Sequence, residues 1–222
     1  MTGLVTGSVC CLHTDESVHE NKIQVAITDL VHGEYKVWAF LSGMYSGAYF
    51  YPEIGDEVIV GFLNHSKDTP VILGSMLPDK NHNQVPLSNE NKQKAFFSYS
   101  QLSVCFDDAD KSIQIKTPAG NTITLSDNEK SIQISDQNGN TLCLSSEGIE
   151  LSSQKNISIN AMGDISFSSG GKTSLASTID MNISGANINI NAEIKLIAKG
   201  EAAAELSASG QTTIKGAMVM IN

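Results

Sequence analysis

The stretch PEIGDEVIVGFLNHSKDTPVILGSM, residues 52–76, decides the fold. It holds two apolar runs, residues 58–63 and 71–73, and residues that favour turns bracket both of them. Short apolar runs between turn residues are typical of two strands joined by a loop. The stretch therefore predicts a β-hairpin, and it contains no residue pattern that indicates catalysis.

Further short strands precede this hairpin. Ile23, Val25 and Ile27 alternate with other residues and would share one face of a strand. We expect strands at residues 3–12, 22–28, 35–41, 48–51, 57–63 and 71–74, and none of these segments has the period of a helix. Five or six short strands in about 75 residues predict a small closed barrel, because closure removes exposed sheet edges.

The composition changes near residue 80. Residues 79–94 are polar and predict a linker. After the linker, pairs of large apolar residues two positions apart recur between Ser, Thr, Asn, Asp and Gly, and this repetition predicts a repeat architecture. The predicted organisation is a small closed barrel over residues 1–78, a linker over 79–94 and a repetitive β-region over 95–222. The leading residues of the first seven pairs are Ile113, Ile123, Ile132, Leu142, Ile149, Ile157 and Ile165.

A repeat as short as the step from Ile149 to Ile157 cannot enclose a core alone. It spans about 26 Å when extended, which provides one strand and one turn. Three chains that each contribute one side would bury the Ile and Leu residues on a common axis, and folding would then be coupled to trimerisation. A solenoid formed by a single chain is the alternative.

The composition argues against several function classes. The net charge is −10, all 14 basic residues are lysine, and aromatic residues make up 6% of the chain. A nucleic-acid binder normally carries a basic stripe with stacking aromatics, so no nucleic-acid partner is expected. The N-terminus has neither a charged leader nor a long apolar run, which predicts synthesis in the cytoplasm without a signal peptide.

No residue group indicates catalysis, a cofactor or a metal. Glu53, Asp56 and Glu57 flank a turn, and Asp107, Asp108 and Asp110 are interpreted as another polar turn. The five histidines and four cysteines lack metal-ligand spacing: His13, His19, His32, His65, His82, Cys10, Cys11, Cys105 and Cys143. Because neighbours on a strand face opposite ways, one of Cys10 and Cys11 is expected to be buried and the other exposed. The sequence predicts a protein that is not an enzyme.

The chain resembles the central spike proteins of contractile injection systems, which include VgrG of type VI secretion and baseplate assembly protein V of phages. The resemblance lies in the hairpin of residues 52–75, in NKIQVAI at 21–27, in YKVWAF at 35–40, and in LSVCFDDADKSIQIKTPAGNTITLSD at 102–127. It implies an all-β fold in which a small OB-like barrel is followed by an elongated, intertwined trimeric β-helix. The chain starts at the first barrel strand, so a tail-hub portion would be a separate protein or is missing.

The resemblance also implies partners and site residues. The barrel signature falls on Pro52, Gly55, Asp56, Gly61, Pro70 and Gly74, where the glycines are expected to give tight turns or close backbone approach. The implied function is a homotrimeric needle at the tip of a contractile particle that pierces the target envelope. Tail-hub or baseplate proteins would bind the barrel, and a PAAR-type tip protein or an effector would bind the C-terminus. Export would follow from contraction.

The C-terminus ends in GAMVMIN, in which both faces of a strand would be apolar. Met218 and Met220 would point one way, and Val219 and Ile221 the other. Such an end is either a well-packed last coil or a blunt tip that another protein covers. These four residues are the candidate contact for a tip protein.

Two other functions are alternatives. A β-helical surface fibre or adhesin would bind glycans through its polar outer face. A lyase with a β-helical groove would need clustered charges and exposed aromatics, yet Phe167 is the only aromatic residue after Phe106.

Overall fold

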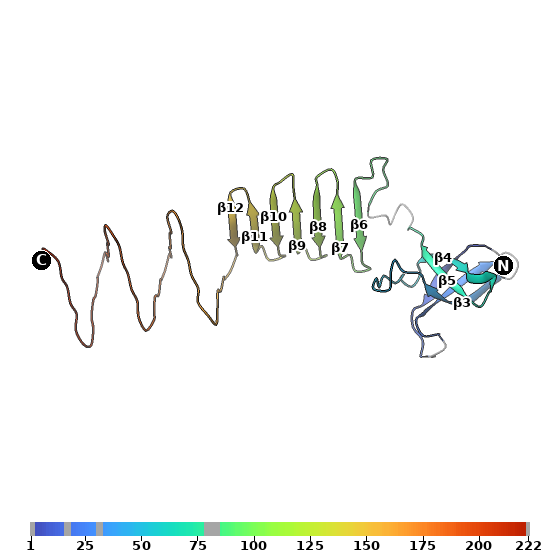
Figure 1. Ribbon diagram of the computed structural model, residues 1–222, viewed down its shortest axis with the longest axis horizontal. Helices are drawn as coiled ribbons and strands as arrows, with labels where there is room; N and C mark the ends of the chain where they lie inside the picture. The colour runs from blue at the N-terminus through green and yellow to red at the C-terminus, as the bar shows by residue number, and fades with distance from the viewer. Residues whose placement is uncertain (1–2, 16–18, 30–32, 78–84, 221–222) are drawn as a thin grey trace. The chain divides into compact units, whose positions relative to one another are not determined.

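The computed structural model describes residues 3–15, 19–29, 33–77 and 85–220, and within them the chain is all-β, as predicted. The chain divides into two units, Met1–Ile159 and Asn160–Asn222. The first unit contains a five-stranded barrel and a seven-stranded antiparallel sheet (Figure 1). The sheet and the second unit both fall in the region for which the sequence predicts a β-helix.

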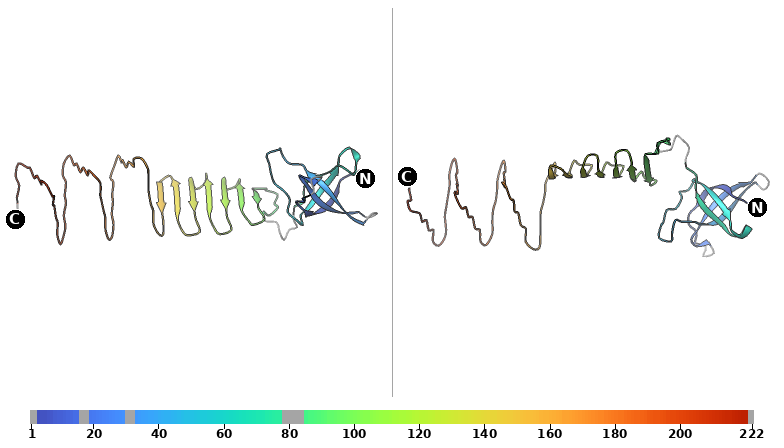
Figure 2. Two further views of the ribbon diagram at one scale, coloured as in Figure 1. Left: turned by 90° about the horizontal axis from the view of Figure 1, so that it is seen from below. Right: turned by 45° about the horizontal axis from the view of Figure 1, so that its top comes forward.

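The barrel follows the prediction for the first part of the chain. Its strands are β1 (Val5–Cys11), β2 (Lys22–Asp29), β3 (Gly33–Leu41), β4 (Glu57–Phe62) and β5 (Pro70–Ser75). They close in the order β1-β2-β3-β5-β4, with β3 and β5 parallel and the other neighbours antiparallel. Figure 2 shows the barrel in two further views. Closure leaves none of these five described strands with a free sheet edge.

The alternating pattern of β2 builds the barrel core. Ile23, Val25 and Ile27 are buried, and they pack with Val9, Ala39, Val58, Val60 and Ile72. The strand predicted at residues 48–51 is wrong, because this segment lies in an exposed loop between β3 and β4. The pairing of β3 with β5 already closes the barrel, so these strands leave no sheet edge for another one.

The hairpin of residues 52–76 forms as predicted. Between β4 and β5, a 3-10 turn spans Leu63–His65, and Asn64 has a φ of 53° there. The Thr69 hydroxyl donates to the Leu63 carbonyl oxygen at 2.7 Å, and the Leu63 amide donates to the Thr69 carbonyl at 3.0 Å. These bonds tie the loop at the point where Pro70 begins β5.

The sheet is a meander with its strands in sequence order. Its strands are β6 (Gln93–Phe97), β7 (Ser103–Asp107), β8 (Ser112–Lys116), β9 (Thr122–Ser126), β10 (Ser131–Ser135), β11 (Thr141–Ser145) and β12 (Gly148–Ser152). The sheet thus begins inside the segment predicted as a linker, whose residues 79–84 lie outside the described residues.

Register places most of the large apolar residues of the seven strands on one face, and Phe97 in β6 lies on the other. Ile113 pairs with Leu125, and Leu125 pairs with Ile132. The same pairing extends across the sheet through Phe96, Val104, Phe106, Ile113, Ile115, Ile123, Leu125, Ile132, Ile134, Leu142, Leu144, Ile149 and Leu151. Because side chains alternate along a strand, the opposite face carries mainly Ser, Thr and Gln. We call these two faces the apolar face and the polar face.

The meander has a structural repeat of two strands that the sequence prediction missed. KSIQI occurs at residues 111–115 and again at 130–134. One edge carries turns that end in Gly-Asn, at residues 117–121 and 136–140, and we call them the Gly-Asn turns. The other edge carries loops that run from Asp to Lys, at 108–111 and 127–130, and we call them the Asp-Lys loops.

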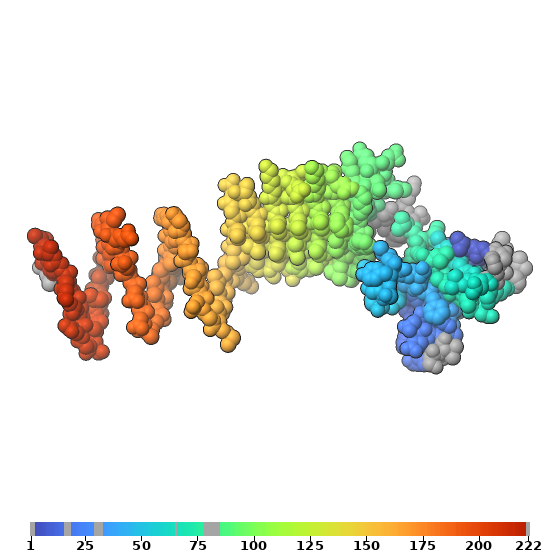
Figure 3. Space-filling model, in the orientation of Figure 1, coloured from blue at the N-terminus to red at the C-terminus, as the bar shows by residue number. Residues whose placement is uncertain are grey.

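The second unit has a different character. Its described residues, 160–220, include no strand and no buried or half-buried residue. In the space-filling view, open space separates successive limbs of this part of the chain (Figure 3). The apolar pairs predicted as strands at residues 157–159 and 165–167, and those farther along, lie in extended chain without strand pairing in the described residues.

Candidate assembly surfaces

The apolar face of the β6–β12 sheet is not covered by the described part of the chain. Ile113 is 37% exposed, Ile132 is 42% exposed and Ile149 is 76% exposed. Contiguous apolar surface of this extent marks an interaction site in a folded protein. This face is the first candidate assembly surface.

The accessible surface of the whole chain leads to the same conclusion. It amounts to 19139 Å² for a chain of 23.7 kDa. A compact monomer of this mass would expose about 9,800 Å². The chain therefore exposes roughly twice the surface of a self-sufficient globular protein.

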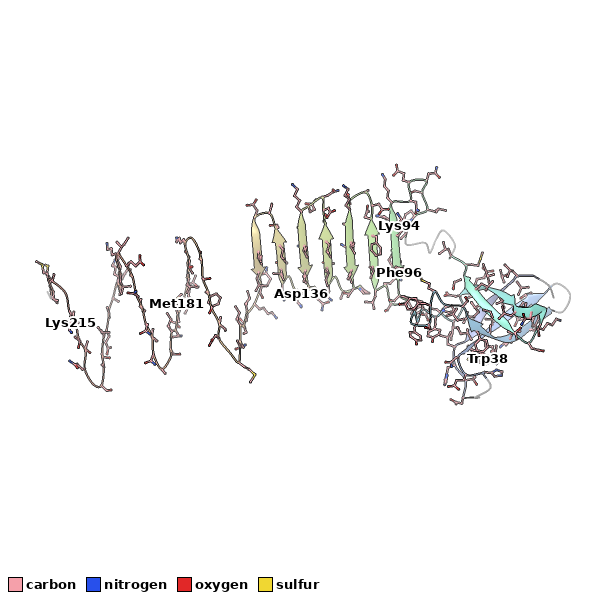
Figure 4. The ribbon with its side chains drawn as sticks, in the orientation of Figure 1. Trp38, Lys94, Phe96, Asp136, Met181 and Lys215 are labelled. Carbon is pink, nitrogen blue, oxygen red and sulfur yellow. The ribbon has the colours of Figure 1, made fainter. Side chains whose placement is uncertain are left out.

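Aromatic residues extend the apolar face at its β6 end. The rings of Phe50 and Phe96 stack with centroids 6.0 Å apart, and the ring centroids of Tyr49 and Tyr51 lie 6.5 Å apart. A groove of about 800 Å³ lies among these side chains and Tyr99. Phe96 is labelled in Figure 4, where it lies near the end of β6. Residues 48–51, which the sequence predicts to form a strand, thus form a loop rich in aromatic residues.

The edge with the Gly-Asn turns is held by side-chain hydrogen bonds. The Asp136 carboxylate accepts hydrogen bonds from the backbone amides of Asn138 and Asn140, each at 2.8 Å (Figure 4). These bonds, led by those from Asn140, lower the pKa of Asp136 to about 2. The Asn121 side-chain oxygen accepts a bond from the Gln137 amide at 3.0 Å, which ties the two turns together.

The opposite edge has the polar turn expected at Asp107, Asp108 and Asp110. The Asp107 carboxylate accepts bonds from the amides of Ala109 and Asp110, and the Gln93 side chain donates to it at 2.8 Å. The bond from Gln93 is the main reason that the pKa of Asp107 lies below its usual value. Among the described residues, no cluster of His, Cys, Asp and Glu could hold a metal ion.

The barrel signature residues occupy distinct positions in the hairpin and the turn before it. Pro52 is buried ahead of that turn, and Gly55 has a φ of +98°, a backbone conformation that favours glycine. The Asp56 carboxylate accepts the Glu53 amide at 2.9 Å, and the Asp56 amide donates to the Glu53 carbonyl at 3.0 Å. Together these bonds form the tight turn that leads into β4.

The other signature residues lie in β4 and β5. Pro70 is buried at the start of β5. Gly61 is buried, and a Cβ added to it would lie 3.2 Å from Leu73 Cδ1. Gly74 follows a β-bulge, and no described atom lies within 4 Å of the position that a Cβ would take there.

A glycine that the sequence prediction did not select has close contacts inside the barrel. A Cβ on Gly7 would lie 2.6 Å from Val25 Cγ1 and 2.7 Å from the Ala26 carbonyl oxygen. Gly7 pairs with both Ile27 and Val58, between two strands. The signal in the sequence was its place in the middle of an alternating strand, where glycine indicates close backbone approach.

The cysteines are free thiols in the structure. The prediction that one of Cys10 and Cys11 is buried and the other exposed is wrong, because both are half-buried. A register shift between Val9 and Cys11 breaks the alternation there. Burial is the larger cause of the raised pKa of the Cys105 thiol, and the Asp107 carboxylate adds to it.

The residues predicted to contact a tip protein lie at the end of the second unit. Met218 is 80% exposed, Val219 is 50% exposed and Met220 is 77% exposed. Ile221 lies outside the described residues. The three described side chains thus present apolar surface to the surroundings of the chain.

Comparison with known proteins identifies the barrel. Residues 5–77 match the family described as the type VI secretion system/phage-baseplate injector OB domain. This match covers the barrel, and it supports a role related to the spike of contractile injection systems. A search among curated proteins finds no match, and the described residues include no helix with the length and hydrophobicity of a membrane span.

Proposed function

We propose that this chain forms the central spike of a contractile injection system, as a homotrimer that pierces the target envelope. The observation that supports this most strongly is the combination of an injector OB barrel with a sheet whose apolar face is uncovered. A barrel of this family favours a place in an injection machine. An uncovered face requires further protein to bury it.

Two further copies of the same chain are the best candidates to cover that face. Three sheets with their apolar faces inward enclose a triangular core, and every Ile and Leu pair then lies near the axis. Residues 160–220 support the same proposal, because their extended backbone forms no strand hydrogen bonds within the described chain and their apolar side chains are exposed. Strands of other copies, at the same level, would complete these bonds and form the intertwined β-helix.

The structure weighs against the alternative in which one chain forms a solenoid. A solenoid would give residues 160–220 a core of their own, whereas all of these residues are exposed. The barrel also weighs against the surface fibre, since its family belongs to baseplates and injectors.

The mechanical role follows from such an assembly. A needle in which each layer is hydrogen-bonded to the next transmits the force of contraction without a hinge. The barrel would join the needle to tail-hub or baseplate proteins. The apolar side chains of Met218, Val219 and Met220 would bind a PAAR-type tip protein or an effector. The protein would be made in the bacterial cytoplasm and exported by contraction.

The test uses contractile particles purified from cells that produce this chain. An epitope tag after residue 222 should be detected by electron microscopy at the end of extended particles, and it should be released or displaced on contraction. Particles from cells that lack the chain should contain less of the spike density and should fail to permeabilise target cells. Detection of the tag on the cell surface, apart from any sheath or tube, would favour the surface fibre instead.

A further inference from the structure

The two edges of the β6–β12 sheet are offset in level. A meander turns alternately at each edge, so a turn at one edge lies level with a gap between turns at the other. The Gly-Asn turn 117–121 joins β8 to β9, and at this level, between the two Asp-Lys loops, no loop joins strands at the opposite edge (Figure 1). The Gly-Asn turn 136–140 joins β10 to β11, where the opposite edge is open after the second Asp-Lys loop.

At each of these openings a notch lies at the edge of the sheet, lined by residues of both faces. The first has a volume of about 400 Å³ and the second about 510 Å³. Apolar side chains form their floors, and the Asp-Lys loops form their rims. The residues that line the two notches form corresponding pairs, and the members of each pair are as far apart in the sequence as the two KSIQI segments. The pairs are Phe106 with Leu125, Lys111 with Lys130, Ser112 with Ser131, Ile113 with Ile132, and Leu125 with Leu144.

The Gly-Asn turns are held by side-chain hydrogen bonds and have exposed tips. Gly120 and Gly139 have φ values of +97° and +82°, and the residues before them, Ala119 and Asn138, are exposed. The bond between Asn121 and the Gln137 amide fixes the spacing of the two turns. Both the turns and the notches repeat every two strands, which is about 9.6 Å along the sheet.

We propose that the two Gly-Asn turns of one copy occupy the two notches of a second copy of this chain. The proposal rests on the homotrimer proposed above and names the surfaces that join its copies. In a closed ring of three, each copy presents one edge to the next, so the contact is heterologous. Because turns and notches lie at equal levels, rotation alone brings them together, without a shift along the axis.

The chemistry of the turns suits the notches. Pro118 and Ala119 are exposed at the first turn, and they would cover the floor formed by Phe106, Ile113 and Leu125. The second turn presents the amide groups of Gln137 and Asn138, which can exchange hydrogen bonds with the polar rim of the second notch.

The paired contacts also fix the register of the assembly. A slip of one repeat would leave one turn without a notch, so only one alignment fills both. The series of notches ends at the β11–β12 hairpin. The loop of this hairpin has two residues, between Ser145 and Gly148, and is shorter than the Asp-Lys loops. The strands of the second unit would then meet the other copies in one register.

Disulfide cross-linking of the full chain tests this docking. One matched pair is Ala119→Cys with Ser112→Cys, and the other is Asn138→Cys with Ser131→Cys. The mismatched controls join Ala119→Cys with Ser131→Cys, and Asn138→Cys with Ser112→Cys. The four native cysteines stay in every variant, and the unmodified chain shows their background. Native mass is measured for each reduced variant before mild oxidation.

Each matched pair should run as a covalent trimer on a non-reducing gel, while single substitutions and mismatched pairs remain mainly monomeric. If the native mass is that of three copies but matched pairs cross-link no better than mismatched ones, the docking is wrong and the homotrimer stands. Cross-linking of a single variant to itself would indicate an isologous contact and would also overturn the docking. A native mass of one copy would instead contradict the proposed assembly.

Discussion

At the residue scale, Gly7 tests the packing of the barrel. Gly7→Ala would place a methyl group against Val25 and Ala26 at less than a normal contact distance, and overpacking of this kind typically costs about 1–3 kcal/mol. Gly74→Ala is the matched control, because open space surrounds that position. The fluorescence of Trp38, the single tryptophan, reports barrel unfolding in denaturant. Equal stability of the two variants would contradict the close approach at Gly7.

The low pKa of Asp136 predicts that the stability of the sheet depends on pH. Its pKa of about 2 lies below the ordinary 3.8, so the ionised form stabilises the fold above about pH 4 and this contribution is lost as the pH falls toward 2. Asp136→Asn should therefore lower stability at neutral pH and make little difference near pH 2. Thermal unfolding between pH 2 and 7 measures this, with Glu150→Gln on the polar face of β12 as the control. A constant difference at every pH would be the contrary result.

At the scale of the element, adjacent residues of β10 lie on opposite faces of the sheet, so each face can be tested separately. Ile134→Asp places a carboxylate on the apolar face, where desolvation without a partner costs several kcal/mol for each ion. Gln133→Asp places the same group on the polar face. Sedimentation at several concentrations should show dissociation of the first variant and an unchanged assembly for the second. Dissociation of both, or of neither, would contradict the proposed role of the apolar face.

The sequence predicted the elements whose pattern is local. Alternation of Ile23, Val25 and Ile27 indicated β2 and the barrel core, and the turn residues around 58–63 and 71–73 indicated the hairpin. The segment 48–51 was mistaken for a strand, because aromatic residues suit strands and only the closed barrel shows that no edge remains for it. The notches escaped prediction for a similar reason, since they depend on which edge each turn occupies. The recurrence of KSIQI at 111–115 and 130–134 would have indicated them.

At the scale of the whole molecule, residues 160–220 test whether other copies pair with the second unit. Their backbone lies extended, without strand pairing in the described chain. If other copies supply the missing bonds, amide hydrogen exchange in this region should be slow, with protection comparable to that of β8–β10. Ile134→Asp should remove this protection while the barrel stays protected. Rapid exchange of residues 160–220 in the unmodified protein would contradict an intertwined β-helix.

The central claim is that three copies of this chain together complete a core that no single copy has. Native mass spectrometry of the purified full chain tests it most directly. The account predicts a single species of about 71 kDa, three times the 23.7 kDa of one chain, that persists on dilution. A folded species at 23.7 kDa would contradict it.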